Sequence, residues 1–151
     1  MEISTDVVKE LRERTGVSVM QCKKALEEAN GDVSKAEEIL RAQGVAGAHK
    51  KQDRTLGAGT VASYVHDSTI GAMVLLSSET DFVAKNPEFG ALAREIAMHI
   101  SAMDPVDTTT LLEQPYIKDE SKSIKDLLTN ATQKFGERVE ITQFARFSAR
   151  G

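Results

Sequence analysis

The sequence predicts an α+β protein, in which three N-terminal helices precede a three-stranded antiparallel sheet with helices packed on one of its faces. Three observations favour this fold class. Apolar residues recur at helical spacing through residues 1–44. Runs at 60–66, 71–77 and 139–148 have the composition of strands. Between them, residues 87–103 keep an apolar stripe at helical spacing, which predicts a long helix against the sheet.

Each of the three N-terminal helices has a residue suited to cap its start and another suited to end it. The expected N-caps are Ser4 or Thr5, then Ser18, then Asp32. The expected ends are Gly16, Asn30-Gly31 and Gly44. Three helices of about three turns each can enclose one small core. Residues 1–44 are therefore expected to form a separate helical module.

The second of these helices separates a buried face from an exposed one. Its apolar stripe consists of Cys22, Ala25, Leu26 and Ala29. At 100° per residue, Met20 lies nearly opposite this stripe. An outward Met near a helix start is either an adaptable contact surface or a scattered surface apolar residue. The stripe position of Cys22 favours a buried thiol over a reactive one.

Residues 45–58 lose the helical periodicity and contain glycines and small residues beside a few basic ones. We expect a linker there, helical in part. From residue 59 the pattern changes to strands, and residues 59–151 are expected to form a second, α+β domain. Within it, Asp67-Ser68-Thr69-Ile70 is expected to join the first two strands as a hairpin. Many residues of these strands are apolar or small on both faces, and an exposed apolar sheet face favours self-association.

Local signals also define the later helices and the last strand. Asn86 suits the N-cap and Pro87 the first position of the long helix, which Asp104-Pro105 ends. Ser123 is expected to cap a further helix that Gly136 ends. Two strands alone are marginal, so residues 139–148 are expected to complete the sheet. The apolar alternation slips phase in that strand, which indicates a bulge or coverage on both faces.

The segment from Thr80 to Pro87 is the most informative stretch of the chain. It lies between a strand and the long helix, where unpaired N–H groups and function often occur together. It places the carboxylate of Asp81 beside the ring of Phe82, without a nucleophile, a base or a glycine loop. From residue type alone, a core Phe82 and a capping Asp81 are the more common arrangement. The alternative is a contact with another protein.

Composition and motif searches favour binding over catalysis. The formal net charge of −4 argues against a general nucleic-acid binder. The N-terminus lacks a signal peptide's apolar core, and no run approaches the roughly 20 apolar residues of a membrane span. The single cysteine, Cys22, fits a reducing compartment. A cytoplasmic location is therefore expected. The three histidines have no metal-ligand spacing, so neither a metal nor another cofactor is expected. A small hydrolase using Asp67, Glu79 or Asp81 remains a rival hypothesis.

Four groups of residues resemble the bacterial elongation factor Ts family, in the family's order and over nearly the whole chain. The first is the N-terminal segment Leu11–Gly16, Met20–Leu26 and Glu28–Asp32, and the second is the core signature Thr80–Asn86. The others are Ile96–Ile100 and Leu112–Tyr116. The resemblance implies a non-enzymatic guanine-nucleotide exchange factor for elongation factor Tu. It also implies that the N-terminal helices resemble a ubiquitin-associated domain and dock on the nucleotide-binding domain of Tu.

The resemblance assigns contact residues by position. Arg12, Met20 and Lys23 match contact positions of the N-terminal module, as does Val19, where the family often has Met. Asp81 and Phe82 match the pair that intrudes near the Mg²⁺ and nucleotide of Tu, with Thr80 and Val83 beside them in the same signature. His66 matches a contact histidine at a strand end in the core; from the residue alone, it is either a surface contact or a polar strand end.

The chain also departs from the family pattern. Residues 104–110 stand where many members have a much longer helical stretch, so a second core subdomain and a protruding helical hairpin are expected to be absent. Short members dimerise through the core sheet, which implies a homodimer here in a two-to-two assembly with Tu; a monomeric exchange factor is the alternative. A ubiquitin-associated-type adaptor is the other rival function. It would need the surface around Met20 but neither Asp81 nor Phe82.

Overall fold

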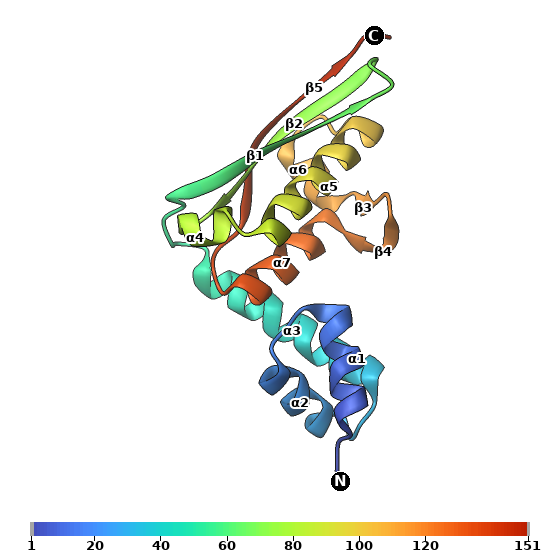
Figure 1. Ribbon diagram of the computed structural model, residues 1–151, viewed down its shortest axis with the longest axis vertical. Coiled ribbons are helices and arrows are strands. Elements are labelled where there is room, and N and C mark those ends of the chain that lie inside the picture. The colour runs from blue at the N-terminus through green and yellow to red at the C-terminus, as the bar shows by residue number, and fades with distance from the viewer. Residues whose placement is uncertain (1, 151) are drawn as a thin grey trace. The chain divides into compact units, whose positions relative to one another are not determined.

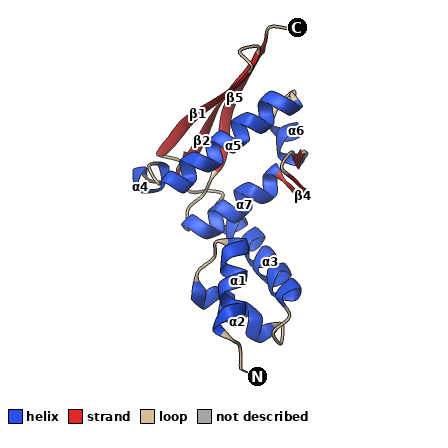
Figure 2. Cartoon of the chain, turned by 45° about the vertical axis from the view of Figure 1, so that its right-hand side comes forward, coloured by secondary structure: helices blue, strands red, loops and turns tan. Residues whose placement is uncertain are grey.

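The computed structural model describes residues 2–150 and shows an α+β chain (Figures 1 and 2). The chain divides into two compact units, Met1–Asp53 with Thr129–Gly136, and Arg54–Leu128 with Glu137–Gly151. The helices of the first stretch are α1 (Thr5–Thr15), α2 (Val19–Glu28) and α3 (Val33–Lys51). The later helices are α4 (Asp81–Ala84), α5 (Pro87–Met103), α6 (Thr108–Glu113) and α7 (Ile124–Phe135). The strands are β1 (Ala58–His66), β2 (Ile70–Ser78), β3 (Pro115–Tyr116), β4 (Asp119–Ser123) and β5 (Glu140–Ser148).

The three N-terminal helices enclose one small core, with caps at the predicted residues. The side chains of Ser4, Ser18 and Asp32 each accept a backbone N–H at a helix start. Gly16 ends α1 in the left-handed region, with a φ of 71°. The buried core comprises Val8, Leu11, Val17, Cys22, Ala25, Leu26, Ala29, Ala36 and Leu40. Burial raises the pKa of the Cys22 thiol, which fits the predicted buried, unreactive cysteine.

The prediction that Gly44 ends the third helix is wrong, because α3 continues to Lys51. The glycine is instead buried where α3 approaches the C-terminal turn of α7. A Cβ built at position 44 would lie 2.8 Å from Oε1 of Gln133, so a larger residue here would displace the end of that side chain. Residues 45–51 are helix rather than irregular linker.

The second unit is built on a three-stranded antiparallel sheet in the order β1-β2-β5. The register pairs Leu75 with Gln143 but Leu76 with Ile141, which leaves Thr142 as an extra residue in β5. This bulge accounts for the phase slip in the sequence of the last strand. In Figure 2 the helices of this unit lie on one side of the sheet. The predicted fold class is therefore confirmed.

The core of the second unit lies between the central strand and α5. Alternate residues of β2, which are Ala72, Val74 and Leu76, are buried, as are Phe89, Ile96 and Ile100 of α5. The predicted start of α5 is confirmed, since the side chain of Asn86 accepts the N–H of Glu88 at 2.8 Å and Pro87 is the first helical residue. Asp104 ends the helix in the left-handed region. This packing fixes the position of the β2–α5 connection, which carries α4.

The short helices α4 and α6 and the short strands β3 and β4 were not predicted. Asp107 caps the single turn α6, and β3 pairs with β4 as a small hairpin where the sequence indicates only an extended connection. The hairpin is fastened to α5 by side chains. His99 contacts Gln114 and the backbone of Ile117, while Glu95 accepts hydrogen bonds from Tyr116 and Lys118. His99 is fully buried and joins α5 to this hairpin through both ring nitrogens.

Candidate protein-binding site

The connection between β2 and α5 presents a large aromatic side chain to solvent. Phe82 lies in the single-turn helix α4 and is 87% exposed, which makes the core interpretation of this residue wrong. Asp81 beside it is also exposed. It is the first helical residue and not the cap, because Thr80 occupies the N-cap position. An exposed ring on a short helix has an unfavourable hydration free energy that a partner's surface can relieve.

The next two residues of α4 hold the turn on the second unit. Val83 is 4% exposed and Ala84 is also buried. The predicted contact role of Val83 therefore does not fit its position, since its side chain packs inward and anchors the turn that carries Phe82. Thr80 Oγ1 accepts the N–H of Val83 at 3.4 Å, and Ser78 Oγ donates to the carbonyl oxygen of Thr80 at 3.0 Å. The site thus combines the exposed side chains of Asp81 and Phe82 with the buried side chains of Val83 and Ala84, which anchor the turn.

The three carboxylates of the rival hydrolase hypothesis do not converge. Asp67 lies in the β1–β2 turn, whereas Glu79 follows the opposite end of β2. A nine-residue strand spans about 30 Å, so these groups are too far apart to act on one substrate. The carboxylate of Glu79 is also occupied, because it accepts the backbone N–H of Arg138 at 2.5 Å and a bond from Arg54 at 3.4 Å. Asp67 and Glu79 therefore form no acid–base pair.

A second surface lies on the three-helix part of the first unit. Arg12 near the end of α1 is exposed, as are Val19, Met20 and Lys23 in the first turns of α2. Met20 is 80% exposed, which confirms that it points away from the α2 core stripe. Exposed apolar and cationic side chains on α1 and α2 suit a partner with an apolar patch and acidic neighbours.

His66 lies at the exposed end of β1, with a hydrogen-bond partner at Nδ1 and a carboxylate near Nε2. Tyr64 Oη is 3.0 Å from Nδ1, and Asp67 Oδ2 is 3.5 Å from Nε2. The rings of Tyr64 and His66 are stacked with centroids 6.1 Å apart. Tyr64 thus orients the imidazole, although the ring is largely exposed.

The sheet face opposite the helices is apolar and open. The odd-numbered residues of β1 point to it, together with their register partners on β2 and β5. Its exposed apolar members are Val61, Val65, Met73 and Phe147, of which Phe147 is 76% exposed. Contiguous exposed apolar side chains of this kind mark an interaction surface.

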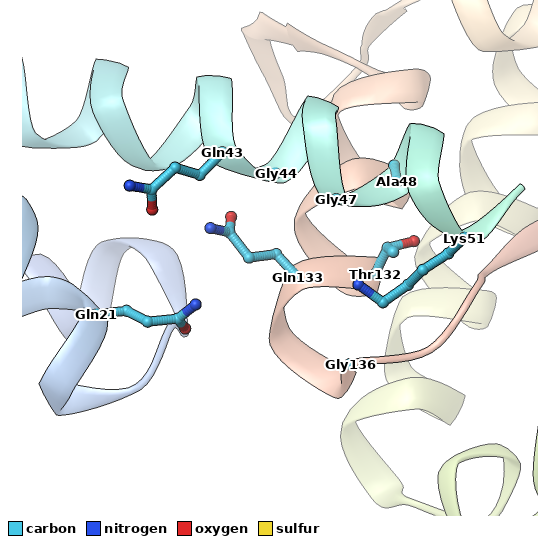
Figure 3. A pocket seen from close by; sticks show the side chains of 9 residues that line it. All are labelled: Gln21, Gln43, Gly44, Gly47, Ala48, Lys51, Thr132, Gln133 and Gly136. Atoms are coloured by element: carbon cyan, nitrogen blue, oxygen red, sulfur yellow. The ribbon is translucent and has the colours of Figure 1, made fainter.

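Two hollows in the described residues bear on the hydrolase hypothesis. The one in the second unit, of about 480 Å³, is lined by apolar, glycine and hydroxyl residues without a His, Cys or carboxylate: Leu56, Gly57, Ala58, Gly59, Leu75, Ser77 and Thr142. In the first unit, Gln21, Gln43 and Gln133 point into a small hollow of about 230 Å³ between α2, α3 and α7 (Figure 3). The hollow is lined by amides and glycines together with Ala48, Thr132 and Lys51, and it contains no His, Cys or carboxylate. Between residues 2 and 150, no group of three or more His, Cys, Asp or Glu side chains is placed to hold a metal ion. No helix in this range is long and apolar enough to cross a membrane.

Comparison with known proteins identifies the family. The family described as Elongation factor TS matches residues 4–107, which include α1 to α5. The chain belongs to the elongation factor Ts family. The elongation factor Ts of Thermodesulfovibrio yellowstonii is 39% identical over 191 residues, covering 97% of this chain and 96% of that protein. That of Thermosipho melanesiensis is 38% identical over 192 residues, covering 97% and 98%. That of Anaeromyxobacter sp. strain Fw109-5 is 37% identical over 192 residues, covering 97% and 88%.

This chain is shorter than the elongation factor Ts sequences that it matches. The first alignment spans 191 residues and the chain has 151, so at least 40 aligned positions, the difference of the two, have no counterpart here. The exposed α4 turn and the N-terminal surface lie inside the matched range 4–107. Both surfaces therefore lie in the part of the chain that matches the family.

Proposed function

We propose that this chain is a guanine-nucleotide exchange factor for elongation factor Tu, acting in the elongation phase of protein synthesis in the cytoplasm. Membership of the elongation factor Ts family supports this proposal. The observation that carries the mechanism is the exposure of Phe82, at 87%, on a turn that is anchored from below. A protein that acts by binding needs no catalytic residues of its own.

In the proposed mechanism, Phe82 acts as a wedge between neighbouring helices of Tu, with Asp81 and the capping Thr80 beside it. GTPases hold their nucleotide through phosphate-loop N–H groups and Mg²⁺. A ring that shifts the adjacent helices disturbs the Mg²⁺ site and weakens GDP binding. By linkage, the chain then binds nucleotide-free Tu more tightly than GDP-bound Tu. The ratio of these two affinities equals the factor by which the chain weakens the binding of GDP to Tu. No covalent bond is made or broken.

The N-terminal helices supply the second contact in this proposal. They form a ubiquitin-associated-like module whose surface of Arg12, Val19, Met20 and Lys23 docks on the nucleotide-binding domain of Tu. His66, oriented by Tyr64, contributes a further contact from the core. The N-terminal surface, His66 and the Phe82 turn are then three contacts on one partner. Once one of them has bound, the effective concentration of Phe82 at its own site on Tu is higher.

The sheet face of Val61, Val65, Met73 and Phe147 is proposed to pair with the same face of a second copy. A twofold interface brings identical surfaces together, and four exposed apolar side chains on a flat sheet are self-complementary in chemistry. The complex is then two chains with two molecules of Tu. Nucleic acid, a membrane and a cofactor have no place in this assembly.

The test is the release of a fluorescent GDP from purified elongation factor Tu, with and without this chain. We expect strong acceleration by the parent chain and little by Phe82→Ala. Val106→Ala is a matched control, because Val106 is 86% exposed in the same unit, and should retain the parent rate. No acceleration by the parent chain would contradict the proposal and would favour an adaptor that uses only the surface around Met20.

A further inference from the structure

One carboxylate outside the exposed turn holds the residues that lead into it. Glu137 precedes β5, 55 residues after Phe82 in the sequence. Its Oε1 accepts the backbone N–H groups of Glu79 and Thr80, both at 3.0 Å. Its Oε2 accepts the hydroxyl of Thr80 at 2.6 Å. Hydrogen bonds to an ionised carboxylate are short and strong, so Glu137 fixes both the backbone and the side chain of the α4 cap.

The connections after β2 and before β5 are joined by hydrogen bonds in both directions. While Glu137 accepts the backbone of Glu79, the carboxylate of Glu79 accepts the backbone N–H of Arg138 at 2.5 Å. Arg138 Nη1 also donates to the carbonyl oxygen of Arg54 at 2.7 Å. We call the four residues Glu79, Thr80, Glu137 and Arg138 the carboxylate clamp. It joins the connection after β2 to the connection before β5.

The short helix α4 depends on such support. Four residues form a single turn, and an isolated turn is unstable because helix nucleation costs more than one hydrogen bond returns. Burial of Val83 and Ala84 fixes one side of the turn. The opposite side carries Phe82 and has no contact with the core, so the direction of its ring depends on how the N-cap is held.

We propose that Glu137 is a positioning residue for nucleotide exchange: the carboxylate clamp fixes Thr80 and thereby aims Phe82 at the partner. This inference rests on the proposed exchange function. It concerns a residue that is distant in sequence and does not itself lie in the exposed turn. A displacement of the reacting or wedging group by about 1 Å is enough to cost a large factor in rate.

The chemistry distinguishes two substitutions. In Glu137→Gln, the amide oxygen can still accept both N–H groups, and the amide nitrogen can donate to Thr80 Oγ1, which becomes an acceptor. In Glu137→Ala all three hydrogen bonds are lost. The clamp therefore predicts near-normal positioning for Gln and loss of positioning for Ala. Glu140→Ala is the matched control: the Glu140 carboxylate lies 3.5 Å from Arg138 Nε, whereas the clamp uses the backbone N–H and Nη1 of Arg138, and the substitution removes the same charge as Glu137→Ala.

The first measurement is GDP release from elongation factor Tu as a function of chain concentration. Glu137→Ala should lower the limiting release rate about tenfold and change the half-saturating concentration by less than about threefold, because the N-terminal surface is intact. Glu137→Gln and Glu140→Ala should stay within about threefold of the parent. In a Phe82→Ala background, Glu137→Ala should cause no further loss, since it acts through that ring. An equal loss in both backgrounds, or no loss at all, would overturn the proposal.

The second measurement needs no partner. The chain contains no Trp, so Phe82→Trp introduces a single fluorescent reporter at the turn. Time-resolved anisotropy should show a wider local motion of this Trp in Glu137→Ala than in Glu137→Gln or Glu140→Ala. Unchanged motion in Glu137→Ala would refute the clamp. If the parent chain failed to accelerate GDP release, the exchange function would fall, and the anisotropy would still decide whether Glu137 orders the turn.

Discussion

The stability of the second unit should fall when the pH is lowered from 7 to 5.5, because of His99. This side chain is fully buried in α5. Its Nδ1 accepts the N–H of Ile117 at 3.2 Å, so the ring hydrogen is on Nε2, which donates to Gln114 Oε1 at 2.9 Å. The neutral ring satisfies both contacts. Burial lowers the pKa of His99 below its ordinary value of 6.5, and the hydrogen bond to Gln114 opposes that shift.

The sign follows from proton linkage. Below pH 6.5 the unfolded chain binds a proton at His99 that the folded chain does not, so acid favours unfolding. The contribution is complete above pH 6.5 and is lost as the pH falls toward the folded pKa. One proton changes the free energy of unfolding by at most about 1.4 kcal/mol per pH unit, which limits the loss between pH 7 and 5.5 to about 1.3 kcal/mol. For a domain of about 60–100 residues, Tm falls by at most about 10 °C.

The assay is thermal unfolding at four pH values in this range, for the parent chain and for His99→Gln. The variant should lose most of the pH dependence, while the exposed His49 and His66 remain in both proteins as an internal control. Carboxylates whose pKa is lowered, such as Glu95 beside Lys118, lose their contribution only in more acidic solution. An equal slope in the parent and in His99→Gln would refute the reasoning.

Three further substitutions test the other surfaces and the core. Met20→Ala removes an 80% exposed side chain, so it should change the free energy of unfolding by less than about 0.5 kcal/mol while weakening binding to elongation factor Tu severalfold in a titration; unchanged binding would remove Met20 from the interface. Met73→Glu places a charge on the open sheet face and should convert the proposed dimer to monomer in analytical ultracentrifugation, whereas a parent chain that sediments as a monomer would contradict the dimer. Phe89→Ala empties a fully buried site in α5 and should cost about 3–5 kcal/mol in urea unfolding; a cost below about 1 kcal/mol would contradict the assigned core.

Features encoded by neighbouring residues could be predicted from the sequence. The caps at Ser18 and Asn86, and Pro87 at the first position of α5, follow from short-range hydrogen bonding and proline geometry. The bulge in β5 could be inferred because one extra residue inverts the apolar alternation. These signals need no knowledge of the remaining fold.

Features that depend on distant residues could not be predicted in this way. Gly44 has the local signature of a helix end, but α3 continues through it and it is buried beside the Gln133 side chain of α7. The β3–β4 hairpin is too short for a periodicity, and its fastening to α5 uses side chains such as Glu95. The exposure of Phe82 also contradicts the usual burial of phenylalanine, which only the placement of α4 on the folded core reveals.

The candidate site could be predicted in part from the sequence. The resemblance to the family assigns Asp81, Phe82 and Met20, and all three are exposed. It also assigns Val83, whose inward position could not be inferred from a motif. Glu137 carries no sequence signal at all, because its partners Glu79 and Thr80 are more than 50 residues away. Residues that position a site from another part of the chain emerge only from the folded structure.

The measurement that tests the central claim most directly is the thermodynamic coupling between this chain and GDP on elongation factor Tu. Calorimetric titrations would give the Kd of GDP with and without the chain, and the Kd of the chain with and without GDP. The account predicts that both constants rise by one common factor, and that Phe82→Ala reduces that factor toward one. A parent chain that binds Tu while leaving the Kd of GDP unchanged would contradict the account.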